Sequence, residues 1–456
     1  MTNLRAIKEF NIDKSAYKLL SKDENEILPI LIQASKILAD VYLEQENGHE
    51  KYPGANLYPF DVSDYEIEKA ALKNSNILSP YTVVEKNRNG LMATPFHLKY
   101  KTHLSKISEL LKKAASKAKN KSFAKYLKIS AESILNGNYK KMDMAWLDNK
   151  NSNLIFLLGP YERYLDKRFF KKMAYLSFIG IKDKYYTRQA ERIYKILSTT
   201  SGDKPHQYPT PSRIQIFSIR NLFFSGFLAR ALFMSEHIPS EDSTIQESGS
   251  RLIGYLSSMD HKFNNLLYPI FKSIFEKRFQ KSYSEDLLRR GNYYLVFVTG
   301  LARQLHRFEG TRERLKQLFP VIEEINSLVS GNQHCKHLVM KGVINQKELE
   351  AIIIMLICWW FSEWILAKKS NIREDYLKGD MAAINFLIKE GALHEKDGIS
   401  WPNFAKIFFE MENLSNILTG LLQDGTYQEA KEFLSRYLSP ESFKAFDKHL
   451  SKIKPL

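Results

Sequence analysis

Cysteine is almost absent from this chain of 456 residues, which contains only Cys335 and Cys358. Two cysteines exclude a disulfide framework and a cysteine-based zinc module, and they suit a reducing compartment. Glycine and proline number 20 and 15, so the chain is neither fibrous nor of low complexity. The 44% of hydrophobic residues excludes a disordered chain and supplies a sizeable core, in two or three domains or in one large two-part unit.

Long hydrophobic runs are also scarce. The N-terminal residues 1–14 mix charged and apolar side chains, so we expect no secretory signal peptide. The longest apolar run, residues 351–367, contains Glu363 and is followed at once by Lys368 and Lys369. Because a membrane-spanning helix needs about 20 apolar residues, we expect a buried core helix instead. The expected protein has no transmembrane segment and is soluble, either cytoplasmic or exported without a recognisable signal peptide.

Acidic residues are outnumbered, with 51 Asp and Glu against 67 Lys and Arg, which gives a formal charge of +16. A positive field suits nucleic acid, an anionic membrane or an acidic protein as a partner. Ten lysines and one acid, Glu109, lie between Lys99 and Lys128. No arginine and no known nucleic-acid motif accompanies them, so we favour a solvated helix face. Nucleic-acid or anionic-membrane binding through the lysine-rich helices 98–128 stays open as an alternative.

Helical periodicity dominates the rest of the chain. Apolar residues recur at three- and four-residue steps in 26–46, 98–118 and 122–136. Strand-like segments are fewer: a hairpin pairs 81–84 with 91–94, and further strands are expected at 154–158, 174–181, 213–219 and 251–256. Two polar stretches, 199–212 and 238–250, are the expected linkers. The pattern predicts a predominantly helical α+β protein with a small sheet from the middle of the chain.

Catalytic motifs are missing as well. The chain contains no phosphate-binding loop, dinucleotide fingerprint, nucleophile elbow or H-E-x-x-H sequence. The one local histidine cluster is His334 with His337, which would share a helix face and could form a metal pair. Lys336 lies between them and no carboxylate is near, so a polar helix face is the better interpretation. The residues taken alone define no active site.

Eight short segments nevertheless follow one another in the order of a known family, within a match that runs from about residue 75 to 435. They are 79–84 (SPYTVV), 142–148 (MDMAWLD), 158–164 (LGPYERY), 178–183 (FIGIKD), 238–242 (IPSED), 249–252 (GSRL), 321–324 (VIEE) and 385–392 (NFLIKEGA). Together they resemble the dipeptidyl peptidase III family of zinc metallopeptidases, especially its bacterial members.

The resemblance implies where a zinc site should lie. In the family, two histidines and a glutamate bind zinc, and a second glutamate acts as the general base. The first ligand falls on Ala302, the general base on Arg303, the second ligand on His306 and the third ligand on Glu324. Only the last two retain a residue that can bind a metal.

These departures argue against catalysis. A methyl group cannot coordinate zinc, and the guanidinium of Arg303 stays protonated and repels a cation. Further family positions are also replaced: they fall on Leu176, Tyr376, Leu328 and Asn326. We therefore expect no catalytic residue, no bound metal and no other cofactor. We predict instead that Arg303 and Glu324 form an ion pair, partly buried between the two former zinc helices.

Glu162 retains a family acid that binds the free amine of a peptide N-terminus. A peptide groove and a purely structural role for Glu162 are both open. His306 alone is best interpreted as a buried histidine with satisfied hydrogen bonds.

The family fold implies two lobes with a cleft between them. A mixed lobe with a small β-barrel or sheet should comprise residues 1–185, 205–265 and about 411–456. A helical lobe with the former zinc helices should comprise 186–204 and 266–410. Residues 1–75 match the family only weakly.

The leading hypothesis is therefore a catalytically inactive relative, a pseudopeptidase, that binds a peptide or protein partner, possibly acidic, through its cleft or basic surface. The alternative is an active zinc-dependent peptidase with a rebuilt metal site made of His306, Glu324 and one of His334 or His337. Zinc would be a cofactor only in that alternative.

Overall fold

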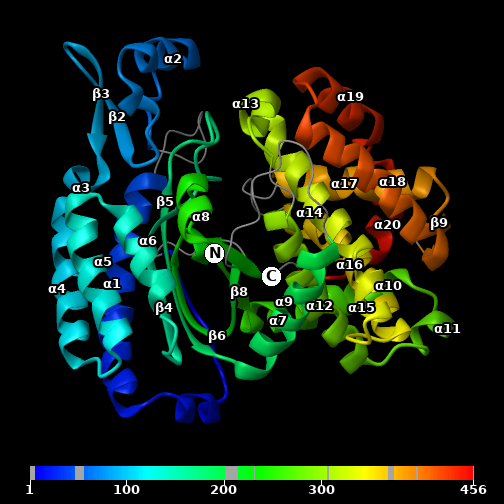
Figure 1. Cartoon of the computed structure of the whole chain (residues 1–456). Helices are drawn as coiled ribbons and strands as arrows, with labels where there is room; N and C mark the ends of the chain where they lie inside the picture. The colour runs from blue at the N-terminus through cyan, green and yellow to red at the C-terminus, as the bar shows by residue number, and fades with distance from the viewer. Residues whose placement is uncertain are drawn as a thin grey trace. The chain divides into compact units, whose positions relative to one another are not determined.

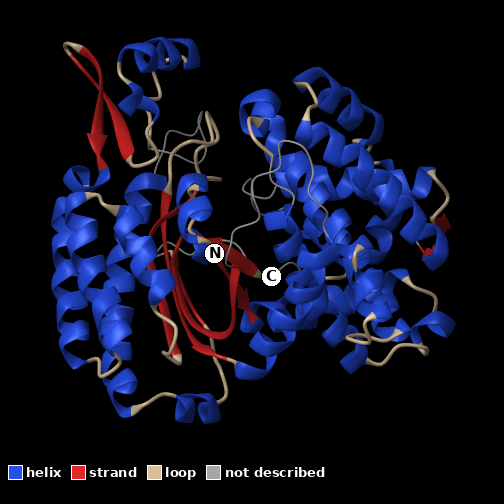
Figure 2. Cartoon of the chain, in the orientation of Figure 1, coloured by secondary structure: helices blue, strands red, loops and turns tan. Residues whose placement is uncertain are grey.

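The computed structural model describes residues 6–46, 56–200, 214–230, 232–305, 308–367, 374–396 and 399–454. The chain forms two compact units that are interleaved in sequence (Figure 1). The first comprises Met1–Lys184, Pro211–Phe233 and His237–Ser257; the second comprises Tyr185–Thr210, Met234–Glu236 and Ser258–Leu456. Helices dominate both units, and the large sheet lies in the first (Figure 2). The predicted fold class, α+β and predominantly helical, is confirmed.

The sheet of the first unit has the strand order β4-β5-β6-β8-β7, with β1 paired to β6. Its strands are β1 (Ile7–Glu9), β4 (Leu154–Glu162), β5 (Ala174–Lys182), β6 (Ile214–Gly226), β7 (Ser235–Ile238) and β8 (Ser250–Tyr255). The pairs β4–β5 and β5–β6 are antiparallel, whereas β6–β8 is parallel. Almost every residue of β4 and β5 is buried, which explains why these segments are continuous apolar runs rather than alternating ones.

Four helices cover this sheet in layers. Helix α1 (Lys22–Glu46) packs directly on β4, β5 and β6, and α4 (Lys101–Lys117) packs on α1. Helix α5 (Lys121–Asn136) lies against α4, and α6 (Tyr139–Asp148) lies against α5 (Figure 1). Helix α5 ends where Gly137 adopts a left-handed conformation, φ +75°, which glycine tolerates without strain. The three helices expected from periodicity are present within a few residues of their predicted ends.

The smaller elements of the first unit include the expected hairpin. Strands β2 (Thr82–Asn87) and β3 (Gly90–Pro95) pair antiparallel around the two-residue turn Arg88-Asn89. The others are helices α2 (Asp64–Lys73), α3 (Phe96–Lys99) and α8 (Asp242–Ser248), with 3₁₀ turns at Lys14–Leu19 and Ser75–Leu78. The prediction that 238–250 is only a linker is wrong, because α8 forms within it. The buried side chain of Ile245 anchors this helix. A helix of seven residues is too short to show a helical period in the sequence.

The second unit is built around three long helices. They are α12 (Glu285–Leu305), α14 (Phe319–Gln333) and α16 (Gln346–Ala367), with α12 in contact with both others. The surrounding helices are α7 (Lys184–Thr200), α9 (Leu256–Lys262), α10 (Tyr268–Ile274), α11 (Lys277–Gln280), α13 (Thr311–Leu315), α15 (Cys335–Met340), α17 (Glu374–Lys389), α18 (Phe404–Gln423), α19 (Tyr427–Tyr437) and α20 (Glu441–Leu450). A hairpin of β9 (Leu393–Lys396) and β10 (Ile399–Pro402) completes the unit.

Helix α16 contains the long apolar run. It is long and apolar enough to cross a membrane, yet 83% of its most apolar 18-residue window is buried inside the unit. Within the apolar run 351–367 the one acid, Glu363, pairs with Lys262 at 2.8 Å, and both side chains are fully buried. The position of α16 matches the core helix expected from the sequence.

The C-terminal stretch lies elsewhere than expected. We predicted that about 411–456 joins the mixed lobe, and this is wrong: the stretch belongs to the second unit. Helix α18 packs on α14, and α20 packs on α16, where Phe443 and Phe446 lie 5.1 and 4.3 Å from the Phe361 ring. The rings of α20 are buried on the helical core of the second unit. The order of the helices along the chain does not indicate which unit covers them.

Candidate functional site

The candidate site lies where α12 and α14 approach each other most closely. A Cβ atom added at Gly331 of α14 would lie 2.9 Å from the Val298 carbonyl oxygen and 3.1 Å from the Ala302 Cβ. A helical glycine costs about 0.5–1 kcal/mol relative to alanine, and here it permits the close approach of the helices. Ala302 is therefore buried at the contact, with 1% of its surface exposed.

Arg303 and Glu324 meet across this helix pair. The Arg303 Nη2 donates to the Glu324 carboxylate and also to the Ser327 Oγ at 3.2 Å. Ser327 in turn donates to the carbonyl oxygen of Glu324 at 3.0 Å. The Glu324 side chain is 6% exposed and that of Arg303 is 28% exposed. The structure thus brings together the two residues for which an ion pair was predicted, and it adds Ser327 as a third member.

A third helix covers the Glu324 side of the pair. Gly379 of α17 lies so near α14 that an added Cβ would be 3.2 Å from Ile325 Cγ1 and 3.3 Å from the Val321 carbonyl oxygen. Tyr376, one of the positions at which the resemblance implies a replaced family residue, is half-buried one turn earlier on α17. Asn326 and Leu328 are buried on α14. The pair consequently lies in a packed helical environment.

The described residues at this site do not fit zinc. Ala302 offers no donor atom, and the guanidinium of Arg303 engages the carboxylate that the resemblance assigns as a ligand, Glu324. A cation placed at Glu324 would have to displace Arg303 and lie beside its positive charge. His306, the remaining candidate ligand, lies outside the described residues.

Two described members of the alternative ligand set, Glu324 and His334, lie well apart. His334 follows Glu324 by ten residues along α14, a rise of about 15 Å. The donor atoms of two ligands of one zinc ion are each about 2 Å from the metal, so these two atoms lie no more than about 4 Å apart. His334 and His337 have ring centroids 6.1 Å apart and lie at the start of α15. Within the part of the chain that the structure describes, no group of three His, Cys, Asp or Glu side chains could hold a metal ion.

Both cysteines are fully buried free thiols. Burial raises the pKa of the Cys335 and Cys358 thiols well above the ordinary value, because a thiolate would lose its hydration. Neither sulfur is therefore a thiolate nucleophile or ligand near neutral pH.

Glu162 ends strand β4 in the first unit and is 8% exposed. Its Oε1 accepts hydrogen bonds from the backbone N–H groups of Arg163 at 2.7 Å and Tyr164 at 3.0 Å. These bonds hold the loop that follows the strand, which is a structural task. Leu176, another altered family position, is buried in β5 opposite Gly159. Peptide binding by Glu162 stays a prediction.

An unusual acid beside this loop was missed by the sequence analysis. Asp143 of α6 is buried and accepts a hydrogen bond from the Tyr161 hydroxyl at 2.8 Å. Burial, opposed by the Tyr161 hydrogen bond and aided by the Glu241 charge, raises the pKa of Asp143 to about 8. Only the tertiary structure reveals this, because in the sequence Asp143 is one polar residue in an amphipathic helix.

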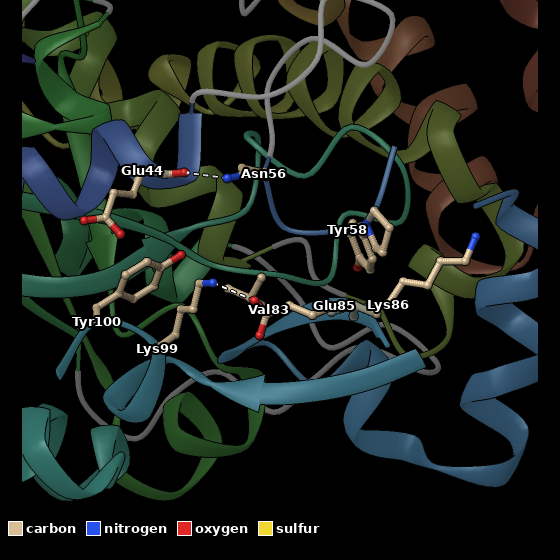
Figure 3. A pocket seen from close by; sticks show the side chains of 10 residues that line it. Glu44, Asn56, Tyr58, Val83, Glu85, Lys86, Lys99 and Tyr100 are labelled. Atoms are coloured by element: carbon tan, nitrogen blue, oxygen red, sulfur yellow. Dashed lines mark hydrogen bonds and ion pairs between the residues drawn. The ribbon is translucent and has the colours of Figure 1, made fainter. Parts of the chain in front are cut away.

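A pocket of about 480 Å³ lies in the first unit (Figure 3). Its charged lining residues are Glu44, Glu85, Lys86 and Lys99, with the rings of Tyr58 and Tyr100 beside them. Lys99 pairs with Glu85 at 2.6 Å, Lys86 pairs with Asp61 at 2.8 Å, and Glu44 faces His103 at 3.4 Å. The lining contains two acids and two lysines, so its formal charges balance and do not favour an ion of either sign.

The lysine-rich stretch 98–128 forms α4, α5 and the end of α3. The apolar stripes of α4 and α5 are buried and the lysines are exposed, which agrees with a helix face in contact with solvent, and Leu98 before α4 is exposed as well. The prediction of nucleic-acid or membrane binding is not decided by this arrangement alone.

Comparisons with known proteins concern the fold. No family model matches the chain. The structure of dipeptidyl peptidase III from Caldithrix abyssi aligns with a TM-score of 0.83 and 23% identity, covering 99% of this chain and 96% of that one. The enzyme of the same name from Corallococcus sp. strain EGB aligns with a TM-score of 0.86 and 20% identity, covering 100% and 94%. The chain therefore has the dipeptidyl peptidase III fold, as the sequence resemblance implied.

One curated protein also matches. Nudix hydrolase 3 of Arabidopsis thaliana is 24% identical over 474 residues, which cover 94% of this chain. The chain spans 61% of the length of that relative.

Proposed function

We propose that this chain is a non-hydrolytic protein with the dipeptidyl peptidase III fold, which binds a peptide or protein partner. The observation that carries the proposal is the Arg303–Glu324 ion pair beside Ala302. This cation–carboxylate pair stands at the positions that the resemblance assigns to the general base, Arg303, and to the third metal ligand, Glu324.

The chemistry of peptide hydrolysis explains why this substitution matters. A zinc peptidase needs a metal to polarise the scissile carbonyl and a base to take a proton from water. Loss of the general base alone lowers the rate by about 10²–10⁴. A guanidinium stays protonated at working pH and cannot accept that proton. Arg303 thus removes the base, while Ala302 removes a ligand.

Peptide recognition does not require the metal. The backbone N–H groups of Arg163 and Tyr164 hold the Glu162 carboxylate in one orientation. An oriented carboxylate can bind the ammonium group of a free peptide N-terminus through a charge-assisted hydrogen bond. This supports a partner with an accessible N-terminus, and the chain's net charge of +16 favours an acidic one.

The test combines metal analysis, turnover and binding on the full chain. After incubation with zinc and dialysis, we expect less than about a tenth of an equivalent of zinc and no release of naphthylamine from dipeptidyl-naphthylamides. Stoichiometric zinc, with turnover that is lost in both His306→Ala and Glu324→Ala, would overturn the proposal.

Binding is measured separately, by fluorescence anisotropy with acidic pentapeptides labelled at the C-terminus. A free N-terminus should bind at least about tenfold more tightly than an acetylated one, and Glu162→Gln should abolish that difference. Glu68→Gln, at an exposed position of α2 in the same unit, is the matched control. Equal binding of free and acetylated peptides would leave Glu162 a purely structural role.

The alternative of an active zinc peptidase has no support from a specific contact among the described residues, because His334 and His337 lie far from Glu324. The likeness to Nudix hydrolase 3 extends over part of that protein, and we do not propose a Nudix activity from it.

A further inference from the structure

The solvent side of helices α4 and α5 is lined with lysine. Between residues 99 and 128, ten lysines stand against one glutamate, a net charge of +9. This short stretch therefore carries more than half of the formal charge of +16. The lysines of the two helices and their connection define what we call the lysine face: Lys101, Lys106, Lys112, Lys113, Lys117, Lys119, Lys121, Lys125 and Lys128.

Packing forces these lysines onto one surface. Helix α4 buries an apolar stripe against α1 and α5, and α5 buries its own stripe against α4 and α6. All nine lysines are exposed, while Leu104, Leu111 and Phe123 are fully buried. Because α4 and α5 lie side by side (Figure 1), their exposed sides join into a continuous basic area.

Acidic partners are scarce on this area. Among the residues that the structure describes, one ammonium group of the lysine face has a carboxylate within 4 Å, that of Lys117 with Glu26 at 3.7 Å, and the Asp23 carboxylate accepts from the backbone N–H of Lys119 at 2.9 Å. Glu109 is the one acid within the face, and Glu132, further along α5, faces Lys141 at 3.4 Å. Like charges so close together repel each other and destabilise the folded state. The arrangement is therefore not one that stabilises the helices.

The dimensions of the face suit a long polyanion. Helix α4 has 17 residues and is about 25 Å long, which corresponds to about seven base pairs of duplex. Two helices side by side give a width of about 20 Å. Duplex DNA presents about one phosphate charge per 1.7 Å of its axis, so several lysines can reach phosphates at once.

The composition of the face discriminates among polyanions. Along the described residues 98–136 the exposed large hydrophobic side chains are Leu98 and Leu135, one at each end of the stretch, whereas membrane-surface helices insert a row of apolar side chains into the interface. Tyr100, Phe123 and Tyr126 are buried, so no ring is offered for stacking on single-stranded bases. Arginine, which reads guanine edges in a bidentate manner, is absent. We infer that the lysine face binds the phosphate backbone of double-stranded nucleic acid without sequence preference.

This inference is independent of the peptide-binding proposal, because it rests on other residues and another ligand. The test is fluorescence anisotropy of a labelled 20-base-pair DNA of mixed sequence with the full chain, from 50 to 200 mM KCl. With five or six phosphate contacts, log K should fall with log salt at a slope of about −5. The affinity should therefore fall about 10³-fold over this range, and an unrelated sequence should bind equally well.

A triple charge reversal locates the site. Lys112→Glu with Lys113→Glu and Lys125→Glu should weaken binding at least about 30-fold at 50 mM KCl and reduce the slope by about 3. The matched control reverses three exposed lysines elsewhere, Lys69 and Lys73 of α2 and Lys431 of α19, with the same change in net charge. Its affinity should stay within about threefold of the unaltered chain. Circular dichroism verifies that both variants are folded.

Several outcomes would overturn the inference. An equal loss in the control would show that the overall charge, not this face, attracts the duplex. Tighter binding to single-stranded DNA, to vesicles with 30% phosphatidylserine, or to poly-glutamate would identify another class of partner. A flat salt dependence would exclude phosphate contacts altogether.

Discussion

The guanidinium of Arg303 on α12 donates to the carboxylate of Glu324 on α14, and the two side chains thereby join these packed helices. In a zinc peptidase a cation at this point is a metal that can polarise a substrate. In this chain the positive charge at the contact belongs to a side chain of the protein itself, and the ion pair joins α12 to α14.

Breaking this pair should destabilise the second unit. Arg303→Ala leaves the Glu324 carboxylate nearly buried and uncompensated, and we expect a loss of about 2–4 kcal/mol in the free energy of unfolding. The variant Arg303→Met with Glu324→Gln removes both charges and should recover most of the loss. Urea unfolding of the unaltered chain, of Arg303→Met, of Glu324→Gln and of the double variant gives the coupling energy between the two side chains. Additive effects of the two changes would contradict a direct interaction.

The buried pair of Lys262 and Glu363 should be still more sensitive. Both side chains have no exposed surface, and the Lys262 ammonium also lies 3.2 Å from the centre of the Trp359 ring. Glu363→Gln leaves a buried ammonium without its counter-charge, and we expect a cost of about 3–5 kcal/mol. Glu441→Gln, in the exposed pair with Lys444, should change stability by less than about 1 kcal/mol.

A second double variant tests the cause of that cost. Lys262→Met with Glu363→Leu removes both charges, and it should be clearly more stable than Glu363→Gln alone. If the double variant is equally unstable, the cost lies in packing rather than in the unpaired charge.

The pKa of Asp143, raised to about 8 by burial, predicts a pH dependence of stability. In the unfolded chain an aspartate titrates near 3.9, so between about pH 4 and 8 the folded state holds a proton that the unfolded state has released. Stability from this group therefore falls as pH rises through that window, by a few kcal/mol in all.

Asp143→Asn should remove this decline, because an amide stays neutral and its oxygen still accepts from Tyr161. Urea unfolding at pH 5, 7 and 9 measures the effect, with Asp148→Asn on the exposed side of α6 as control. An unchanged pH dependence in Asp143→Asn would show that the carboxyl is ionised in the folded protein.

The pKa of Glu24 is shifted in the opposite direction from that of Asp143. Its Oε1 accepts from the Ser152 hydroxyl and from the backbone N–H groups of Asn153 and Leu154, at 2.8 to 3.0 Å. Burial by itself raises the pKa of Glu24, but these hydrogen bonds and those from Ser21 outweigh it, and the pKa is lowered. The stabilisation is present above the unfolded pKa of about 4.3 and is lost as pH falls below it.

Glu24→Gln should therefore cost about 2 kcal/mol or more at pH 7 and progressively less in acid, since a neutral amide accepts these bonds more weakly. Asp40→Asn, on the exposed side of the same helix, is the control. The measurement is urea unfolding at pH 3 and pH 7. An equal loss of stability at pH 3 and at pH 7 would mean that the charge of Glu24 does not contribute to its hydrogen bonds with Ser152, Asn153 and Leu154.

Local patterns predicted most elements of this protein. The apolar stripes at 26–46, 98–118 and 122–136 became α1, α4 and α5, because a helical period is set by neighbours three and four residues away. The hairpin β2–β3 followed from its polar turn. The pairing of Arg303 with Glu324 required the family resemblance as well, since 21 residues separate the two in the chain.

Other features had no local signal. Gly331 permits the approach of α14 to Ala302, but a glycine in a helical segment is equally compatible with a helix end. Ser327 joins the ion pair through its place on the same helix as Glu324, which the sequence analysis overlooked. The C-terminal helices were assigned to the wrong unit, because an amphipathic helix shows that it has an apolar face and not which partner covers it.

The sequence by itself determined the helical and extended segments, the scarcity of metal ligands and the concentration of lysine between residues 99 and 128, because these are properties of composition and short-range periodicity. Only the tertiary structure decided that Arg303 reaches Glu324, that Asp143 is buried as a raised-pKa acid and that the lysines of α4 and α5 share one surface. Burial, charge pairing and the joining of helix faces depend on contacts between residues distant in the chain, which no local pattern specifies.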